Sequence, residues 1–499
     1  MVDRKLAFPD VSLPAEVVAD LWRMNPWWEG KPQQPLPDTR RHLVRLIRRR
    51  IEYKLAPVVV VRGPRQIGKT TALLQVVQDL LDEGTPPLNV FAVQFDQLPE
   101  LDQQEPVLRF VDWYERAVLG KTLNQAAHDG EATYLVLDEV QNLPHWAPQL
   151  KFLVDRTQTT VLVSGSSAFR IEAGRDSLAG RITTLEASVL SLTEIAFFRG
   201  LDLGQPFLED NGLAVLQGKT FWQELAAHGR RQTARDEVFA AFSRRGGYPL
   251  AHRRLEVPWN VVADQLNETV IRRVLRHDLR AGAEGDERDP LLLEETFRLA
   301  CRYAGQTPGL QLLVREVRRA LVADLGGDSV ERHLRALADS LLLRLVPPLE
   351  LRLRRGRGRP KICLADHALR ASWLQEDIPL DPPTLARKPE LTVVAGHLAE
   401  SALGTALCSI PGLDVAHLPA RNGEPEVDFV LTTGDVRIPI EVKYQRRIDP
   451  LRDTESLRTF IEKAAYRAPF GLLVTQTDEA TVDDPRIVAL PLSSFLLLR

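Results

Sequence analysis

The sequence predicts an α/β chain of several domains, with a parallel-sheet core in its first half. Three observations support this fold class. An apolar β-branched run enters a glycine-rich loop and then a helical pattern at 58–81. Two more apolar runs end in polar residues at 134–140 and 159–167, and an alternating segment occupies 426–443. At 499 residues the chain has room for roughly three to four domains of ordinary size.

The composition is that of a folded, water-soluble chain. Hydrophobic residues make up 44% and charged residues 26%, and the formal net charge is −3. That charge excludes a global basic field, so any nucleic-acid surface must be local. The three cysteines have no paired spacing, so we expect no disulfide frame and no zinc site, which favours the reducing cytoplasm.

No membrane partner is expected. The first ten residues lack the apolar core of a signal peptide, and no segment of the sequence reaches the apolar length of a membrane span.

The first motif is a phosphate-binding loop. The segment 58–71 reads VVVVRGPRQIGKTT, which places the loop between a strand and a helix. Backbone amides of such a loop and the following helix N-terminus hold the phosphates of ATP, Lys69 reaches the β and γ phosphates, and Thr70 binds Mg²⁺. The predicted nucleotide-binding residues here are Gly63, Pro64, Arg65, Gln66, Ile67, Gly68, Lys69, Thr70 and Thr71.

An acidic pair follows the second strand, in YLVLDEV at 134–140. Asp138 is predicted to hold Mg²⁺ through its water shell, and Glu139 to orient and polarise the attacking water. Such a pair is a weak signal alone, and the phosphate-binding loop about 70 residues earlier strengthens it.

Two further positions complete the predicted nucleotide site. The strand at 159–165 ends in small hydroxyl residues, of which Ser166 is the first choice for a phosphate or water sensor, followed by Ser164 and Ser167. The alternative is that these serines only shape a tight turn. Arg181 is a candidate arginine finger for a neighbouring subunit, with Arg175 as the second choice and a surface salt bridge as the alternative.

The segments GPRQIGKTT, LDEVQNLPHW, VLVSGSS, SLAGR and GGYPLA together resemble a prokaryotic family of AAA+-type ATPases. The resemblance implies an ATPase core followed by a helical lid, a winged helix and a nuclease-like C-terminal domain. The domains expected are an N-terminal segment at 1–39, the core at 40–190, the lid at 191–285, the winged helix at 286–375 and the C-terminal domain at 390–499. Two tryptophans in the N-terminal segment, Trp27 and Trp28, are expected to dock within the chain.

The winged helix carries a basic hairpin. Helical patterns at 289–305, 310–324 and 328–346, the last with Asp328 as N-cap, precede two strands around a glycine-rich tip within 349–366. A dense cluster of one sign suits contacts to DNA phosphates, and a solvated hairpin on a protein-interaction module is the alternative. The predicted DNA-binding residues are Arg354, Arg355, Arg357, Arg359 and Lys361.

The segment 426–443 predicts a hairpin with a two-residue turn at Thr433–Gly434. This register places Val427, Phe429 and Leu431 opposite Ile440, Ile438 and Val436, which makes one face apolar. The other face carries Glu426 opposite Glu441, with Asp428 as a diagonal neighbour of Glu441 and Lys443 alongside.

Together with Glu400, in a predicted helix at 392–408, these residues resemble the E…D…ExK pattern of PD-(D/E)XK nucleases. The resemblance implies that Glu400 and Asp428 are metal ligands, that Glu441 is a ligand or general base, and that Lys443 is the cation at the scissile phosphate. The metal implied is Mg²⁺ or Mn²⁺. The alternative is a nuclease-like fold that only binds or assembles.

We therefore expect an ATPase that processes DNA, including branched DNA, and that also cleaves it as a metal-dependent endonuclease. ATP hydrolysis would drive binding, remodelling or branch migration, and the arginine finger implies a homo-oligomer, such as a ring. The alternative is a nucleotide-dependent switch in signalling or defence whose C-terminal domain does not cleave. A third alternative is a regulator that only binds DNA.

Overall fold

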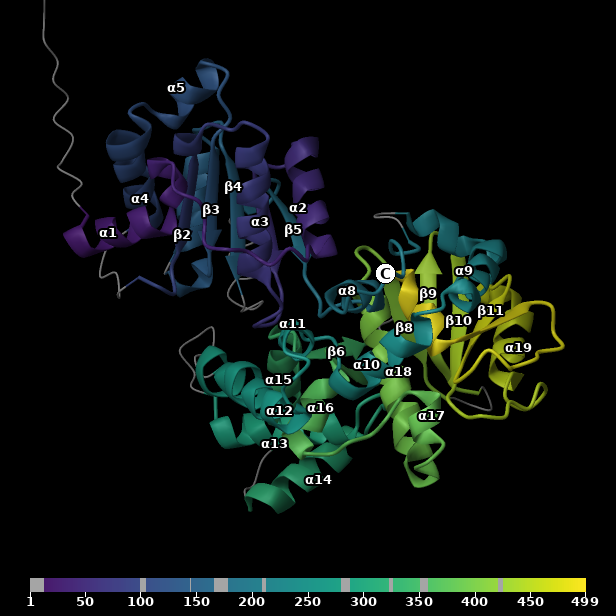
Figure 1. Cartoon of the computed structure of the whole chain (residues 1–499). Helices are drawn as coiled ribbons and strands as arrows, with labels where there is room; N and C mark the ends of the chain where they lie inside the picture. Colours follow the sequence, from purple (N-terminus) through teal and green to yellow (C-terminus); the bar gives the residue numbers. More distant parts are fainter. Residues whose placement is uncertain are drawn as a thin grey trace, which may run out of the picture. The chain divides into compact units, whose positions relative to one another are not determined.

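In the computed structural model the chain forms two compact units. Figure 1 labels the helices and strands of the chain. One unit comprises the chain up to Gly63 together with Gly68–Ala187, and the other comprises Pro64–Ile67 together with Ser188–Arg499. The residues described are 13–98, 105–143, 145–165, 178–208, 212–279, 288–322, 326–350, 358–420 and 425–499.

The first unit contains a five-stranded sheet in the order β2-β3-β4-β1-β5, and all neighbouring strands are parallel. Its apolar runs read as near-continuous hydrophobic strands because both faces of such a sheet are covered by helices. The predicted parallel-sheet core is thus confirmed. Its strands are β1 (Val58–Arg62), β2 (Val90–Gln94), β3 (Tyr134–Asp138), β4 (Thr160–Gly165) and β5 (Ile182–Glu186), and its helices are α1 (Ala15–Met24), α2 (His42–Tyr53), α3 (Lys69–Asp82), α4 (Pro106–Tyr114), α5 (Leu123–His128) and α6 (Trp146–Val154).

The N-terminal segment covers the edge strand β2. The indole N–H groups of Trp27 and Trp28 both donate to the carbonyl of Val90, at 3.0 and 2.9 Å. The side-chain amide of Asn25 bonds to both backbone groups of Ala92, as the backbone of a neighbouring strand would. It donates to the Ala92 carbonyl at 2.8 Å and accepts from the Ala92 N–H at 2.7 Å. The tryptophans therefore dock within the chain, as predicted, and satisfy a sheet edge that would otherwise invite pairing.

The second unit begins with a helical region, part of which packs on the C-terminal sheet. Helix α9 (Lys219–Arg231) lies against strand β12 (Ile487–Pro491) and the short helix α20 (Leu492–Phe495). Arg235, which is buried, donates to the Ser494 hydroxyl at 2.8 Å and forms an ion pair with Asp478 at 2.6 Å. The helices of this region are α8 (Leu192–Phe198), α9 (Lys219–Arg231), α10 (Arg235–Arg245), α11 (Pro249–Arg253) and α12 (Trp259–Leu266).

We expect His252 of α11 to make the second unit sensitive to acid. Its imidazole is 2% exposed, Nε2 lies 2.7 Å from the Gly246 carbonyl, and burial lowers its pKa to about 4. Between pH 6.5 and 4 the unfolded chain binds a proton that the folded chain does not, so the free energy of unfolding should fall by about 3 kcal/mol as pH falls through this window. Denaturant unfolding at pH 7.5 and 4.5 measures this loss.

The control for this prediction is His252→Gln, which keeps a hydrogen-bond donor and removes the titration. The variant should lose less stability than the wild type over the same pH interval. An equal loss in both proteins would show that other groups cause the acid sensitivity.

The predicted order of three helices followed by two paired strands is present, with two changes of detail. Asp328 lies in the first turn of the third helix, whose N-cap is Gly326, and the first hairpin strand lies before residue 349. The elements are α13 (Pro290–Arg302), α14 (Leu310–Leu321), α15 (Gly327–Asp339), β6 (Leu343–Val346), β7 (Lys361–Leu364) and α16 (His367–Leu374).

The C-terminal domain is a mixed five-stranded sheet in the order β12-β11-β10-β9-β8, with helix α18 packed against β7 and β10. Strands β10, β11 and β12 are parallel, whereas β8–β9 and β9–β10 are antiparallel. The elements are α17 (Pro382–Leu385), α18 (Thr392–Cys408), β8 (Asp414–Leu418), β9 (Val427–Thr433), β10 (Val436–Lys443), α19 (Glu455–Glu462), β11 (Gly471–Thr475), β12 (Ile487–Pro491) and α20 (Leu492–Phe495).

The predicted register of the β9–β10 hairpin was wrong by two residues. Ile440 lies opposite Phe429 and Val436 lies opposite Thr433, which puts the turn at Gly434–Asp435. One step further along this register, Glu441 comes directly opposite Asp428 instead of diagonal to it. On the polar face of the hairpin, the side chains of Asp428 and Glu441 are buried.

The segment Pro389–Cys408, which includes α18, is long and apolar enough to cross a membrane by length and composition alone. The expectation that no segment reaches this length was therefore wrong. In the structure the helix lies against β6, β7 and β10 and carries Glu400 toward them.

Candidate functional site

The phosphate-binding loop lies at the carboxyl end of β1. Gly68 is the N-cap of the 14-residue helix α3. Its φ of +88° is a backbone conformation that favours glycine. The buried Lys69 side chain returns over the loop and donates to the Gly63 carbonyl at 3.1 Å. This geometry brings the lysine and the helix N-terminus to one place, as a bound phosphate requires.

The predicted magnesium ligands meet at the carboxyl ends of two strands. The Thr70 hydroxyl donates to Asp138 Oδ2 at 2.6 Å. The pKa of Asp138 is raised, because the effect of burial exceeds the lowering effect of the hydrogen bonds from Ser164 and Thr70. The hydroxyl and the carboxylate are hard oxygen donors, so these two residues fit Mg²⁺ that arrives with ATP.

Ser164, the second choice among the serines, contacts the acidic pair. Its hydroxyl donates to Asp138 Oδ1 and accepts from the Glu139 backbone N–H at 3.4 Å. The first choice, Ser166, lies outside the described residues, as do Ser167 and Arg175. Ser164 therefore holds the acidic pair in place from the neighbouring strand β4.

Glu139 adopts a backbone conformation that is rare for a residue with a side chain, with φ +53°. Its carboxylate accepts from the Gln141 side chain and lies 3.9 Å from Lys69 Nζ. Sequence reasoning missed Gln141; the signal was the polar pair Gln141-Asn142, one residue after the acidic pair. The contacts aim Glu139 at the side of the loop where Lys69 lies.

The loop tip, Pro64–Ile67, groups with the second unit, where Arg65 forms a two-pronged ion pair with Asp278 at 2.7 and 2.8 Å. Gln66 is exposed, Ile67 is fully buried, and Thr71 is half-buried in the first turn of α3. Arg65 is thus held by a carboxylate that the sequence did not indicate.

Arg181 lies at the opposite end of the sheet from the loop. It directly precedes β5, and its carbonyl accepts from Val58, the first residue of β1. Since β1 has five residues, this position is roughly 16 Å from the loop along the strand. The guanidinium forms an ion pair with Asp155, so Arg181 does not serve its own nucleotide site.

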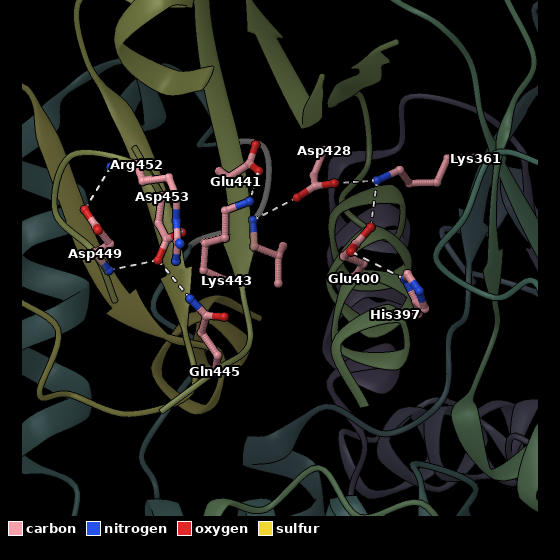
Figure 2. Close-up of polar contacts among 11 residues, drawn as sticks. Lys361, His397, Glu400, Asp428, Glu441, Lys443, Gln445, Asp449, Arg452 and Asp453 are labelled. Atoms are coloured by element: carbon pink, nitrogen blue, oxygen red, sulfur yellow. Dashed lines mark hydrogen bonds and ion pairs between the residues drawn. The ribbon is translucent and has the colours of Figure 1, made fainter. Parts of the chain in front are cut away.

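The predicted nuclease residues do come together, but each acid faces a basic partner (Figure 2). Glu441 accepts from Lys443 Nζ at 2.6 Å. Burial raises the pKa of Glu441 to about 8, the charge of Asp428 adds to the rise, and Lys443 opposes it. The polypeptide after Lys443 is fixed separately, by hydrogen bonds from Gln445 and the Asp449 backbone to Asp453, both at 2.8 Å.

Lys361 differs most from its predicted role. It was expected on an exposed DNA-binding tip, yet it is 1% exposed and points into the C-terminal domain. Its ammonium lies 2.7 Å from Asp428 Oδ1 and 2.8 Å from Glu400 Oε2 (Figure 2). Burial disfavours the charged lysine, but the two carboxylates outweigh burial and raise its pKa, so the side chain is an ammonium.

The carboxylates do not fit the implied Mg²⁺ or Mn²⁺. The ammonium already lies between the two acids that would provide the first ligands, and the other Asp428 oxygen accepts from the Val442 N–H at 2.9 Å. Among the described residues no group of three or more His, Cys, Asp or Glu side chains is arranged to hold a metal ion.

Of the remaining predicted DNA-binding residues, the structure describes one. Arg359 is exposed, and its carbonyl lies 2.8 Å from His417 Nε2. Arg354, Arg355 and Arg357 fall outside the described residues.

Three family models match parts of the chain. Residues 55–196 match an AAA domain, residues 237–378 match a domain of unknown function (DUF8612), and residues 395–495 match another (DUF4143). Neither of the last two descriptions names an activity, so they assign no nuclease to the C-terminal domain.

The curated relatives include the uncharacterized proteins Rv2008c of Mycobacterium tuberculosis and Mb2031c of Mycobacterium bovis. Each is 25% identical over 343 residues, which is 67% of this chain and 59% of the relative's own length. Among solved structures, the Walker-type ATPase PABY2304 of Pyrococcus abyssi aligns with a TM-score of 0.37 at 15% identity, over 68% of this chain and 99% of that one.

The Saccharomyces cerevisiae Hsp104–ADP complex aligns with a TM-score of 0.29 at 15% identity, over 78% of this chain and 44% of that one. The loop geometry, the acidic pair and the matching family model agree on one conclusion. The first unit of this chain contains an AAA-type, P-loop, nucleotide-binding ATPase domain.

Proposed function

We propose that this chain hydrolyses ATP and uses the nucleotide cycle to bind and remodel DNA, with branched DNA as the preferred class. The observation that carries the ATPase part is the hydrogen-bonded set of Thr70, Asp138, Ser164 and Glu139 beside Lys69. When Mg²⁺ is bound with ATP, it neutralises part of the phosphate charge. Lys69 binds the phosphates. Glu139 positions the attacking water, and the hydrogen bond from Gln141 fixes the Glu139 carboxylate.

The DNA part of the proposal is supported by the basic hairpin of the winged helix. Four arginines occur within the six residues 354–359 of a chain whose net charge is −3. Such a local concentration suits phosphate contacts. We place Arg181 at a contact between copies of the chain, because it cannot reach its own nucleotide site.

A nucleotide-dependent switch is the second candidate. The observation that favours it is the Lys361 ion-pair set, which neutralises the acids a cleaving domain would need. The two candidates differ in turnover. DNA should raise the ATP hydrolysis rate of a remodelling protein, whereas a switch should hydrolyse ATP slowly and at the same rate with or without DNA.

Replacing Arg355, Arg357 and Arg359 with alanine should weaken binding to all DNA sequences alike. Because three phosphate contacts are removed, the slope of log affinity against log salt should flatten by up to about 3. Fluorescence anisotropy with four-way junction, linear and single-stranded DNA across a salt series measures this, and phosphate release measures ATP turnover in the same samples.

A matched control replaces three exposed arginines elsewhere in the second unit, Arg253, Arg254 and Arg387. Its DNA affinity should stay close to that of the wild type. Unchanged affinity in the hairpin variant, or an ATP turnover that no DNA alters, would contradict the DNA-remodelling proposal and leave the ATPase intact.

A further inference from the structure

We propose that Lys361 is the permanent cation of the carboxylate cluster formed by Glu400, Asp428 and Glu441. In this role it joins the winged helix to the C-terminal domain and takes the place of a metal ion. The proposal goes beyond the ATPase and DNA functions, since it concerns what the nuclease-like cluster does and holds for either candidate function.

The position of the ammonium supports this assignment. It contacts one oxygen each of Asp428 and Glu400, at 2.7 and 2.8 Å, and lies 5.0 Å from the centre of the Phe429 ring. Mg²⁺ held by the same two acids would need oxygens at about 2.0–2.1 Å. The two cations would then share one space and repel each other, so binding of a metal ion requires the lysine to leave.

The lysine cannot leave as an exposed side chain could, because its strand is fixed to helix α18. Ser401 accepts from the Leu364 N–H at 2.9 Å, and Thr405 donates to the Leu364 carbonyl at 2.6 Å. Next to these contacts, a Cβ added to Gly404 would lie 2.5 Å from the Cys363 sulfur. Strand β7 is therefore pressed onto α18, and withdrawal of Lys361 would break a buried junction.

Most of the negative charge of the cluster is compensated without a metal ion. Two ammonium groups, from Lys361 and Lys443, face three carboxyl groups, from Glu400, Asp428 and Glu441, and each carboxyl group has an ammonium partner (Figure 2). Buried acids of a metal site carry excess negative charge that the ion compensates, since unpaired buried charge is costly. Here the lysines supply that compensation.

The first test is metal binding by the full-length chain with the carboxylate cluster intact. A Lys69→Ala background without nucleotide prevents binding of Mg²⁺ or Mn²⁺ together with ATP, and titration with Mn²⁺ in a calorimeter and in a thermal-shift assay should then show no binding in the millimolar range. Binding that disappears on Asp428→Asn would overturn the proposal.

The second test removes the lysine. Lys361→Met should lower Tm by on the order of 10 °C, because two carboxylates lose their buried partner. The isosteric triple variant Lys361→Met, Glu400→Gln, Asp428→Asn removes all three charges and should recover most of that loss. Lys361→Ala leaves room for an ion, so Mn²⁺ should raise its Tm while leaving that of the wild type unchanged.

The third test is cleavage of linear, single-stranded and four-way junction DNA by the wild type with Mg²⁺ or Mn²⁺, where no product is expected. Cleavage that Glu441→Gln abolishes would overturn the proposal. Because DNA binding and ATP turnover are measured separately, this result would leave the ATPase and DNA-remodelling functions standing.

Discussion

Glu139→Gln should lower the rate of ATP hydrolysis by about 10²–10⁴-fold while ATP binding is retained, because a neutral amide cannot take up the proton of the attacking water. The carboxylate lies near Lys69 and is oriented by Gln141, and its backbone is held at φ +53° next to Ser164. Its side chain has no part in strand β3, so the fold should survive. Phosphate release measures turnover, and a fluorescent ATP analogue measures binding.

Two comparisons make this result specific. Glu52→Gln alters an exposed carboxylate of the same unit and should leave turnover unchanged. Lys69→Ala should lose nucleotide binding as well as hydrolysis, because the lysine contacts the phosphates in both steps. Full turnover in Glu139→Gln would mean that another group activates the water.

Gly246→Ala should lower the free energy of unfolding by about 4 kcal/mol or more, which combines backbone strain with a steric clash. Gly246 has φ +68° and ψ −156°, a region open almost only to glycine. An added Cβ would lie 2.2 Å from Asp366 Oδ1 and 2.5 Å from the Ala368 Cβ. Asp366 is itself buried and accepts from the Gly247 N–H at 2.5 Å, so it has no room to move.

The matched control is Gly326→Ala. Gly326 has a negative φ, and a Cβ there would meet nothing within 4 Å. As an N-cap change it should cost less than about 1 kcal/mol. Denaturant unfolding measures the free energy of unfolding of both variants. Equal free energies would contradict the close approach of Asp366 to the Gly246 backbone.

The nucleotide site was predictable from sequence because its signals are local. A β-branched run, a loop with glycines at fixed positions and a helix are contiguous in the chain, and parallel strands bring their carboxyl ends to one edge. Asp138 and Thr70 meet for this reason. Ser164 could be placed nearby on the same grounds, but the choice between it and Ser166 depends on where strand β4 ends.

The hairpin register shows a limit of pattern reasoning. Side chains alternate with a period of two, so a shift of two residues leaves every residue on the same face. The predicted and observed pairings of Phe429, with Ile438 and Ile440, are therefore equally consistent with the apolar face. Only the turn decides between them, and the sequence TTGD allows Gly434 at either turn position.

Lys361 could not be assigned from its neighbours in sequence. It follows four arginines and looks like a fifth charge of the same surface. Its partners lie 39 and 67 residues away, in a helix and a strand of another domain. Local charge density predicts exposure, and the long-range ion pairs override it. The apolar run that follows, at 362–364, was the sequence signal that the lysine begins a core strand, and the structure buries all three of its residues.

The contacts of strand β7 also bear on how this chain can be divided. The family models leave a gap between residues 378 and 395, which looks like a convenient place to cut. A fragment ending there would keep helices α13, α14 and α15 with strands β6 and β7. It would lose the hydroxyls that bond Leu364 and both acids that neutralise Lys361. We therefore expect the two matched regions to fold as one unit, a dependence that the sequence boundaries alone conceal.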